Sequence, residues 1–209
     1  MSREKELKNI TVWSFIGNFV LLVFKFVAGL CGRSSAMLAD AVHSLSDFAT
    51  DIVVFICIHL SSRPIDDDHD YGHGKYETLA TSVIGVVLLF VGVGIFWSGA
   101  SKIYGFYVLG EPIVSPGKIA LIAALVSILV KELLFQVTAA VGRRYESQTV
   151  LANAWHHRSD AFSSVATASG IAGAIWLGDS WTILDPLAAV IVSVLVVKVA
   201  IKLTVPAVN

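Results

Sequence analysis

Long apolar runs separated by short polar segments make up almost the whole of this sequence. A helix needs about 20 apolar residues to cross roughly 30 Å of hydrocarbon. Six stretches reach that length: 10–31, 36–60, 79–101, 119–141, 150–177 and 183–203. The links between them are short and hold glycine, proline, serine or charged residues, as turns do. The pattern predicts an all-α membrane protein with six transmembrane helices in a single domain, residues 1–209.

Two of the six stretches carry ionisable side chains where a bilayer favours apolar ones. Stretch 36–60 holds Asp40, His43, Asp47 and Asp51. The opening half of 150–177 holds His156, His157, Arg158 and Asp160. A single aspartate at mid-membrane costs about 2.5–3.5 kcal/mol on insertion scales. Such residues are functional-site candidates. Lys25, Lys131 and Glu132 add interior charge to two further stretches.

Composition and charge agree with a membrane protein. The chain is 56% hydrophobic and 15% charged, with a mean hydropathy of +0.75, whereas about a quarter of the residues in a soluble domain are charged. The net charge of -1 gives no basic face for nucleic acid.

The distribution of lysine and arginine over the links predicts the orientation. Eight lie on the side that carries both termini and three on the other, and basic residues favour the cytoplasmic side. We therefore expect cytoplasmic termini and a multi-pass protein of the bacterial inner (cell) membrane. Stretch 36–60 then runs inward and 150–177 outward, so matching features on them would be related by inverted symmetry.

Such a match exists between residues 38–47 and 151–160. Six of the ten aligned positions are identical, and both copies contain His-x-x-x-Asp. A motif that occurs twice is harder to dismiss than a single one. We interpret the chain as two inverted three-helix halves, each contributing one copy.

The chemistry of the motif follows from helix geometry, because residues four apart project from one face. His43 with Asp47, and His156 with Asp160, each form a two-ligand pair. Two facing pairs give the four nitrogen and oxygen ligands that tetrahedral Zn(II) takes, at about 2.0–2.2 Å. Imidazole favours zinc and its neighbours over magnesium or calcium, and leaves Fe(II), Co(II), Cd(II) and Mn(II) open. Asp51 is a candidate for the ion's pathway.

Two alternatives remain open for these residues. In one, the polar side chains face the bundle interior and pair with each other or with Arg158, without a ligand. In the other, the chain is an intramembrane metalloenzyme. A catalytic zinc keeps one position open for water and needs a base, commonly Glu, and neither pair has a nearby Glu. We therefore expect no enzyme activity and no prosthetic group. Asp40 and Asn153 are predicted to support the ligands or helix packing.

A second cluster lies in the link 61–77. Asp66, His69 and His73 fall at i, i+3 and i+7 among further aspartates. Two imidazoles and a carboxylate suit a divalent ion, so we predict a cytoplasmic loop site. The alternative is a solvated acidic loop with incidental histidines.

The chain resembles the cation diffusion facilitator family of proton-coupled zinc and transition-metal exporters. The resemblance rests on the two His-x-x-x-Asp motifs and on 71–75, Tyr-Gly-His-Gly-Lys, with Glu77. It implies a transport site formed by His43, Asp47, His156 and Asp160, and a further metal site at Asp66, His69 and His73. It also implies a homodimer that exchanges Zn(II), as substrate, for protons. Most members continue into a cytoplasmic metal-binding domain, and we expect this chain to be a truncated or short form without it.

Overall fold

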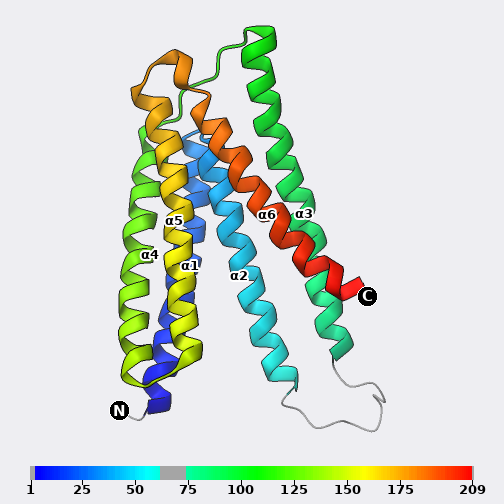
Figure 1. Cartoon of the computed structure of the whole chain (residues 1–209), viewed down its shortest axis with the longest axis vertical. Helices are drawn as coiled ribbons and strands as arrows, with labels where there is room; N and C mark the ends of the chain where they lie inside the picture. Colours follow the sequence, from blue (N-terminus) through cyan, green and yellow to red (C-terminus); the bar gives the residue numbers. More distant parts are fainter. Residues whose placement is uncertain (1–2, 62–73, 209) are drawn as a thin grey trace.

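The computed structural model describes residues 3–61 and 74–208, and side chains within 5–49, 52 and 82–204. These ranges are mostly helical, apart from short connections such as 110–117, and they hold no strand. The long helices are α1 (Arg3–Cys31), α2 (Ser35–Ser61), α3 (Gly74–Tyr104), α4 (Lys118–Arg144), α5 (Gln148–Trp176) and α6 (Leu184–Val208). The short segment η1 (Gly105–Leu109) follows α3, and the short segment η2 (Asp179–Trp181) precedes α6. Each predicted apolar stretch falls on one long helix and extends past its ends by no more than one residue, although most of the helices are longer than the stretches. The helices form an elongated bundle (Figure 1).

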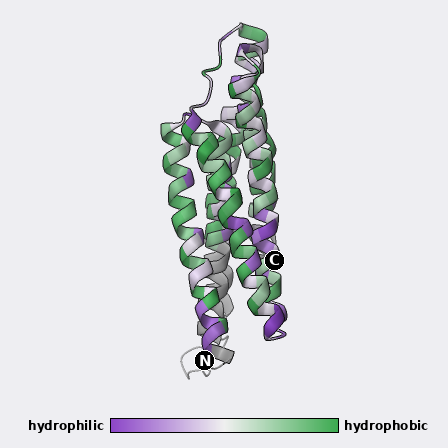
Figure 2. Cartoon of the chain, turned by 90° about the vertical axis from the view of Figure 1, so that its left-hand side faces the viewer, coloured by the Kyte–Doolittle hydropathy of each residue, from purple (hydrophilic) through white to green (hydrophobic). Residues whose placement is uncertain are grey.

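Four helical segments within the described ranges are long and apolar enough to cross a membrane. They are Lys5–Cys31, Ser82–Leu109, Lys118–Arg144 and Asp179–Thr204. The helices that do not qualify, α2 and α5, are those that carry the His-x-x-x-Asp motifs. Polar and small residues lower the hydropathy of α5, and the side chains of most of the second half of α2 lie outside the described residues. Along the bundle, hydrophilic residues gather toward the end near the N-terminus (Figure 2).

Two interhelical turns repeat each other in detail. The turn from α1 to α2 and the turn from α4 to α5 each contain one left-handed residue, Arg33 (φ 49°) and Glu146 (φ 50°). In each, the next residue is a serine, Ser34 or Ser147, whose N–H donates to the carbonyl five residues earlier, at 3.1 and 2.9 Å. Equivalent positions are 113 residues apart. The two turns lie at opposite ends of the bundle (Figure 1).

Helices α3 and α6 form the most extensive helix pair. Gly85, Gly92 and Gly99 are buried at seven-residue intervals along one face of α3. A Cβ added at Gly99 would lie 2.8 Å from Val190 Cγ2 and 3.1 Å from the Pro186 carbonyl oxygen. The absence of side chains at these positions lets the two backbones approach closely.

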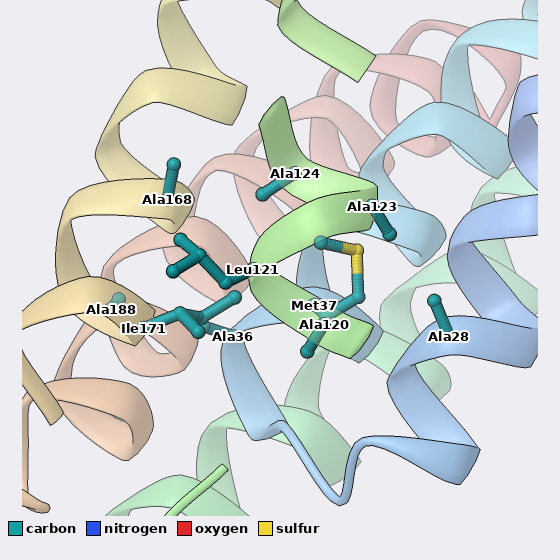
Figure 3. Close-up of a cluster of buried hydrophobic side chains, with 10 residues drawn as sticks. All are labelled: Ala28, Ala36, Met37, Ala120, Leu121, Ala123, Ala124, Ala168, Ile171 and Ala188. Atoms are coloured by element: carbon teal, nitrogen blue, oxygen red, sulfur yellow. The ribbon is translucent and has the colours of Figure 1, made fainter. Parts of the chain in front are cut away.

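Alanine-rich packing closes the bundle near the start of α2. Small side chains from α1, α2, α4, α5 and α6 meet around Met37, Leu121 and Ile171 (Figure 3). Their small volume lets five helices approach one another closely. This end of the bundle therefore has a dense, continuous core.

Asp185 of α6 joins this packed end to the N-terminus of α2. Its carboxylate accepts hydrogen bonds from Ser34 Oγ at 2.5 Å, the Ser35 N–H at 2.7 Å and the Ala36 N–H at 3.3 Å. The first N–H groups of a helix have no partner within the helix. A buried carboxylate that satisfies them also complements the positive end of the helix dipole.

Candidate metal-transport site

The two His-x-x-x-Asp motifs lie on α2 and α5, which contact each other inside the bundle. His43 Nε2 is 4.0 Å from Asp47 Oδ2, and His156 Nε2 is 3.8 Å from Asp160 Oδ2. The i, i+4 spacing thus places each imidazole beside its carboxylate on one helix face.

Three of the four side chains converge from the two helices. One ligand atom from each of His43, Asp47 and Asp160 can be chosen so that all three lie within 4.8 Å of one another. Ligand atoms about 2.0–2.2 Å from a shared zinc ion would stand somewhat closer together, so a small inward movement completes the set. His156 lies outside this cluster, and its side chain is 39% exposed.

The α2 pair has polar atoms without hydrogen-bond partners among the described residues. His43 Nδ1 and Asp47 Oδ2 are both buried and both lack one. Buried polar atoms are nearly always hydrogen-bonded, and each exception needs an explanation. A carboxylate oxygen and an imidazole nitrogen are donor atoms that transition metals bind.

Asp160, by contrast, is already paired. Lys131 of α4 places its Nζ 2.6 Å from Asp160 Oδ2, and the same Nζ donates to Asn18 Oδ1 of α1 at 2.9 Å. Both charged side chains are almost fully buried. Asp160 is therefore paired within the protein, and this partner, Lys131, is not one that the sequence alternative named.

Arg158, the partner that the alternative named, points elsewhere. Its guanidinium lies over the rings of Phe135 and Trp155, with its carbon 4.6 and 5.6 Å from the two centroids. Its Nε is 4.0 Å from Glu132 Oε2. These contacts hold Arg158 on the outer face of α4 and α5.

A second buried ion pair lies one turn before His43. Lys25 of α1 places its Nζ 2.8 Å from Asp40 Oδ2, 3.0 Å from Ser44 Oγ and 3.1 Å from Ser164 Oγ. Three acceptors match the three ammonium protons. Asp40 thus joins α1, α2 and α5, and its described contacts are to Lys25 and Ser164.

A pocket of about 540 Å³ leads to the site between α2, α5 and α6. Its lining residues are Asp47, Ala152, Asn153, His156, Val199, Lys202 and Leu203. Lys202 and Leu203 lie near the end of α6, so the pocket extends from the site toward the end that carries the termini. Asn153, predicted to support the ligands, lies beside His156 on this path.

Two sequence predictions fall outside the described residues. Asp66, His69 and His73 all lie in 62–73, and the side chain of Asp51 is likewise not described. The loop site and the pathway role of Asp51 stay predictions.

The described site includes two residues that motif analysis did not select. Lys131 is a charge inside an apolar stretch for which the sequence predicts no partner, and Asn18 belongs to neither motif. A lysine in the middle of a span nearly always pairs with an acidic or carbonyl group. That rule, applied to Lys131, indicates an acidic or carbonyl partner and makes the aspartates of the motifs candidates for it.

Comparison with known proteins identifies the family of this chain. The family model described as the cation efflux transmembrane domain matches residues 11–209. The chain belongs to the cation diffusion facilitator family. The resemblance inferred from the motifs is thereby confirmed, and with it an integral membrane protein of a transporter family.

Relatives in this family include proteins with different names. The chain is 34% identical to the magnetosome protein MamB of Magnetospira sp., over 94% of the chain and 64% of MamB. It is 33% identical to the manganese efflux system protein MneP of Bacillus subtilis, over 99% of the chain and 69% of MneP. Metal tolerance protein C1 of Arabidopsis thaliana is 37% identical over 87% of the chain and 40% of its own length. The chain thus spans about two thirds or less of these relatives.

Proposed function

We propose that this chain exports a divalent transition metal from the cytoplasm in exchange for protons. Zn(II) is the first candidate for this metal. The ion binds to His43, Asp47, His156 and Asp160. Residues 1–209 form a six-span domain of two inverted three-helix halves, in a bacterial inner membrane with cytoplasmic termini, and two copies act as a homodimer.

The observation that carries the proposal is the convergence of His43, Asp47 and Asp160 from two helices. Buried imidazole and carboxylate atoms without hydrogen-bond partners in the described structure lie on one side of that cluster. A bilayer-spanning bundle tolerates such groups when a cation satisfies them. His156 completes four ligands by rotating toward Asp160, from which it is 3.8 Å away.

Two architectural features support the inverted six-span arrangement. The turns that precede α2 and α5 match residue by residue at a constant offset and lie at opposite ends of the bundle. Helices α2 and α5 are 27 and 29 residues long, which at 1.5 Å per residue exceeds the roughly 30 Å of hydrocarbon.

The relatives make manganese the second candidate substrate. One of them is named as a manganese efflux protein. Two imidazoles favour zinc, because manganese prefers oxygen ligands. Fe(II), Cd(II) and Co(II) accept the same donors and follow as further alternatives.

The arrangement suggests how exchange proceeds. The ion enters through the pocket that reaches Asp47 and His156, binds neutral imidazoles and ionised carboxylates, and leaves after the halves rock about the site. Protons from the outer side then occupy the same groups and prevent the ion from rebinding. The loop residues Asp66, His69 and His73 would collect ions on the cytoplasmic side.

Zinc uptake into proteoliposomes with an imposed proton gradient and an internal zinc indicator tests the proposal. Asp47→Ala and Asp160→Ala should abolish uptake. The matched control is Asp179→Ala, which removes an exposed carboxylate outside the site and should transport like wild type. Undiminished uptake in either site variant would remove the proposed site. Repeating the assay with manganese ranks the two metals.

Absorption spectroscopy of the cobalt-substituted protein separates a transporter from the metalloenzyme alternative. A closed four-ligand site gives a tetrahedral spectrum that does not change near neutral pH. A site that keeps a water ligand would titrate there.

A further inference from the structure

The best-defined contact at the candidate site is an ion pair within the protein. Lys131 Nζ lies 2.6 Å from Asp160 Oδ2, and this same oxygen is 3.8 Å from His156 Nε2. An ammonium group therefore contacts one oxygen of a carboxylate that belongs to the candidate metal cluster.

We propose that Lys131 is a tethered competitor of the transported ion, a role that rests on the function proposed above. Its ammonium neutralises Asp160 while the site is empty, and moves off that oxygen when a divalent cation binds. Asn18 provides the position to which it withdraws, because Asn18 Oδ1 already accepts a hydrogen bond from Lys131 Nζ at 2.9 Å.

The charges explain what the lysine does. Asp47 and Asp160 alone give the empty site two negative charges and the loaded site none. With Lys131 beside them the empty site carries one negative charge and the loaded site one positive charge. The lysine thus stabilises the empty site in a low-dielectric interior and weakens the binding of the ion. Both effects favour release of the ion and return of the unloaded carrier.

Lys25 offers a matched control in the same chain. It is also fully buried and also pairs with an aspartate, Asp40, at 2.8 Å. Its partner, however, is outside the cluster of His43, Asp47 and Asp160. Loss of either lysine removes one buried ion pair, but only loss of Lys131 frees a proposed ligand.

Zinc binding to the purified full chain, measured by competition with a chromophoric zinc indicator, tests this role. Lys131→Met should bind zinc about tenfold more tightly or better, the scale on which one neighbouring charge shifts the proton affinity of a carboxylate. Lys131→Arg should restore wild-type affinity, and Lys25→Met should leave it unchanged. In proteoliposomes at saturating zinc, Lys131→Met should turn over more slowly than wild type.

These measurements distinguish failure of the competitor role of Lys131 from failure of the proposed metal site. If Lys131→Met binds zinc no more tightly than wild type while Asp160→Ala abolishes binding, the competitor role is wrong and the metal site stands. If Asp47→Ala and Asp160→Ala bind zinc like wild type, the site itself is wrong, and the inference goes with it.

Nuclear magnetic resonance of the ¹⁵N-labelled lysine side chains in the wild-type chain covers the case in which Lys131→Met does not fold. Adding zinc should shift the Nζ signal of Lys131, assigned by its loss in Lys131→Arg, and leave that of Lys25 in place. A Lys131 signal that does not move on saturation with zinc would overturn the proposal.

Discussion

At the scale of single residues, five buried charged side chains of the described structure have specific partners. Lys25 pairs with Asp40 and Lys131 with Asp160. Asp185 instead binds the N-terminus of α2. A buried charge that loses its partner costs several kcal/mol, so each contact constrains how the helices can be placed.

Asp185→Ala should destabilise the protein by about 1–3 kcal/mol, because it leaves helix N–H groups and Ser34 Oγ buried without their acceptor. Thermal unfolding in detergent measures this loss. Asp179→Ala, at an exposed position on the same end of the bundle, should change the unfolding temperature little. Equal unfolding temperatures for the two variants would contradict the capping role of Asp185.

At the scale of the helix, small residues decide which elements pair. The buried glycines of α3 face α6 at each of three successive contacts. Gly94, on the same helix, has no atom within 4 Å of an added Cβ. Helix α3 therefore contains glycines packed against α6 and also Gly94, a glycine with free space around it, which serves as a control.

Gly99→Leu should separate α3 from α6 and lower stability by about 1–3 kcal/mol, the usual effect of overpacking. Gly94→Leu adds the same side chain on an exposed face and should be close to neutral. Denaturation of both variants in mixed micelles gives the comparison. A Gly99→Leu protein as stable as Gly94→Leu would show that the close approach of the two backbones is not required.

At the scale of the whole molecule, the two ends of the bundle differ. The alanine-rich core closes one end, and the pocket of about 540 Å³ opens toward the other. Ala152 lines the pocket and is exposed, whereas Ala124 is fully buried in the core. The site is accessible from the end that carries the termini.

In a variant whose native cysteines are replaced, Ala152→Cys should react with a membrane-impermeant thiol reagent applied from the side of the termini. Ala124→Cys should not react from either side. Labelling of inverted and right-side-out vesicles distinguishes the two faces. Reaction of Ala152→Cys only from the opposite face would reverse the direction in which the pocket opens.

Metal binding should also stabilise the whole bundle. A ligand that binds only the folded state adds RT ln(1 + [L]/Kd), about 2.7 kcal/mol at a hundred times Kd. Zinc should raise the unfolding temperature of wild type, and it should raise that of a His43→Ala, His156→Ala double variant by less, because this variant keeps only the predicted loop site. A chelator should reverse the effect. An equal rise in both proteins would place the stabilising ion elsewhere.

The helices, the two motifs and the family could be predicted from the linear sequence. The 36–60 stretch became α2, Ser35–Ser61, because hydrophobic length and turn residues are local properties that a linear pattern records. The pairing of His43 with Asp47 also followed from helical spacing alone. The helix α1 begins at Arg3, seven residues before the predicted stretch, since polar residues such as Lys5 and Glu6 favour helix as well and apolar runs do not mark them.

Which charged groups meet could be seen only in the folded protein. Lys131 and Asp160 are 29 positions apart, and Lys131 and Asn18 are 113 apart, and nothing in their local surroundings selects these partners. Contacts between helices depend on the rotation and crossing of each helix, which arise from packing over the whole bundle. For this reason the sequence indicated ligands, while the fold showed that one of them is held by a lysine.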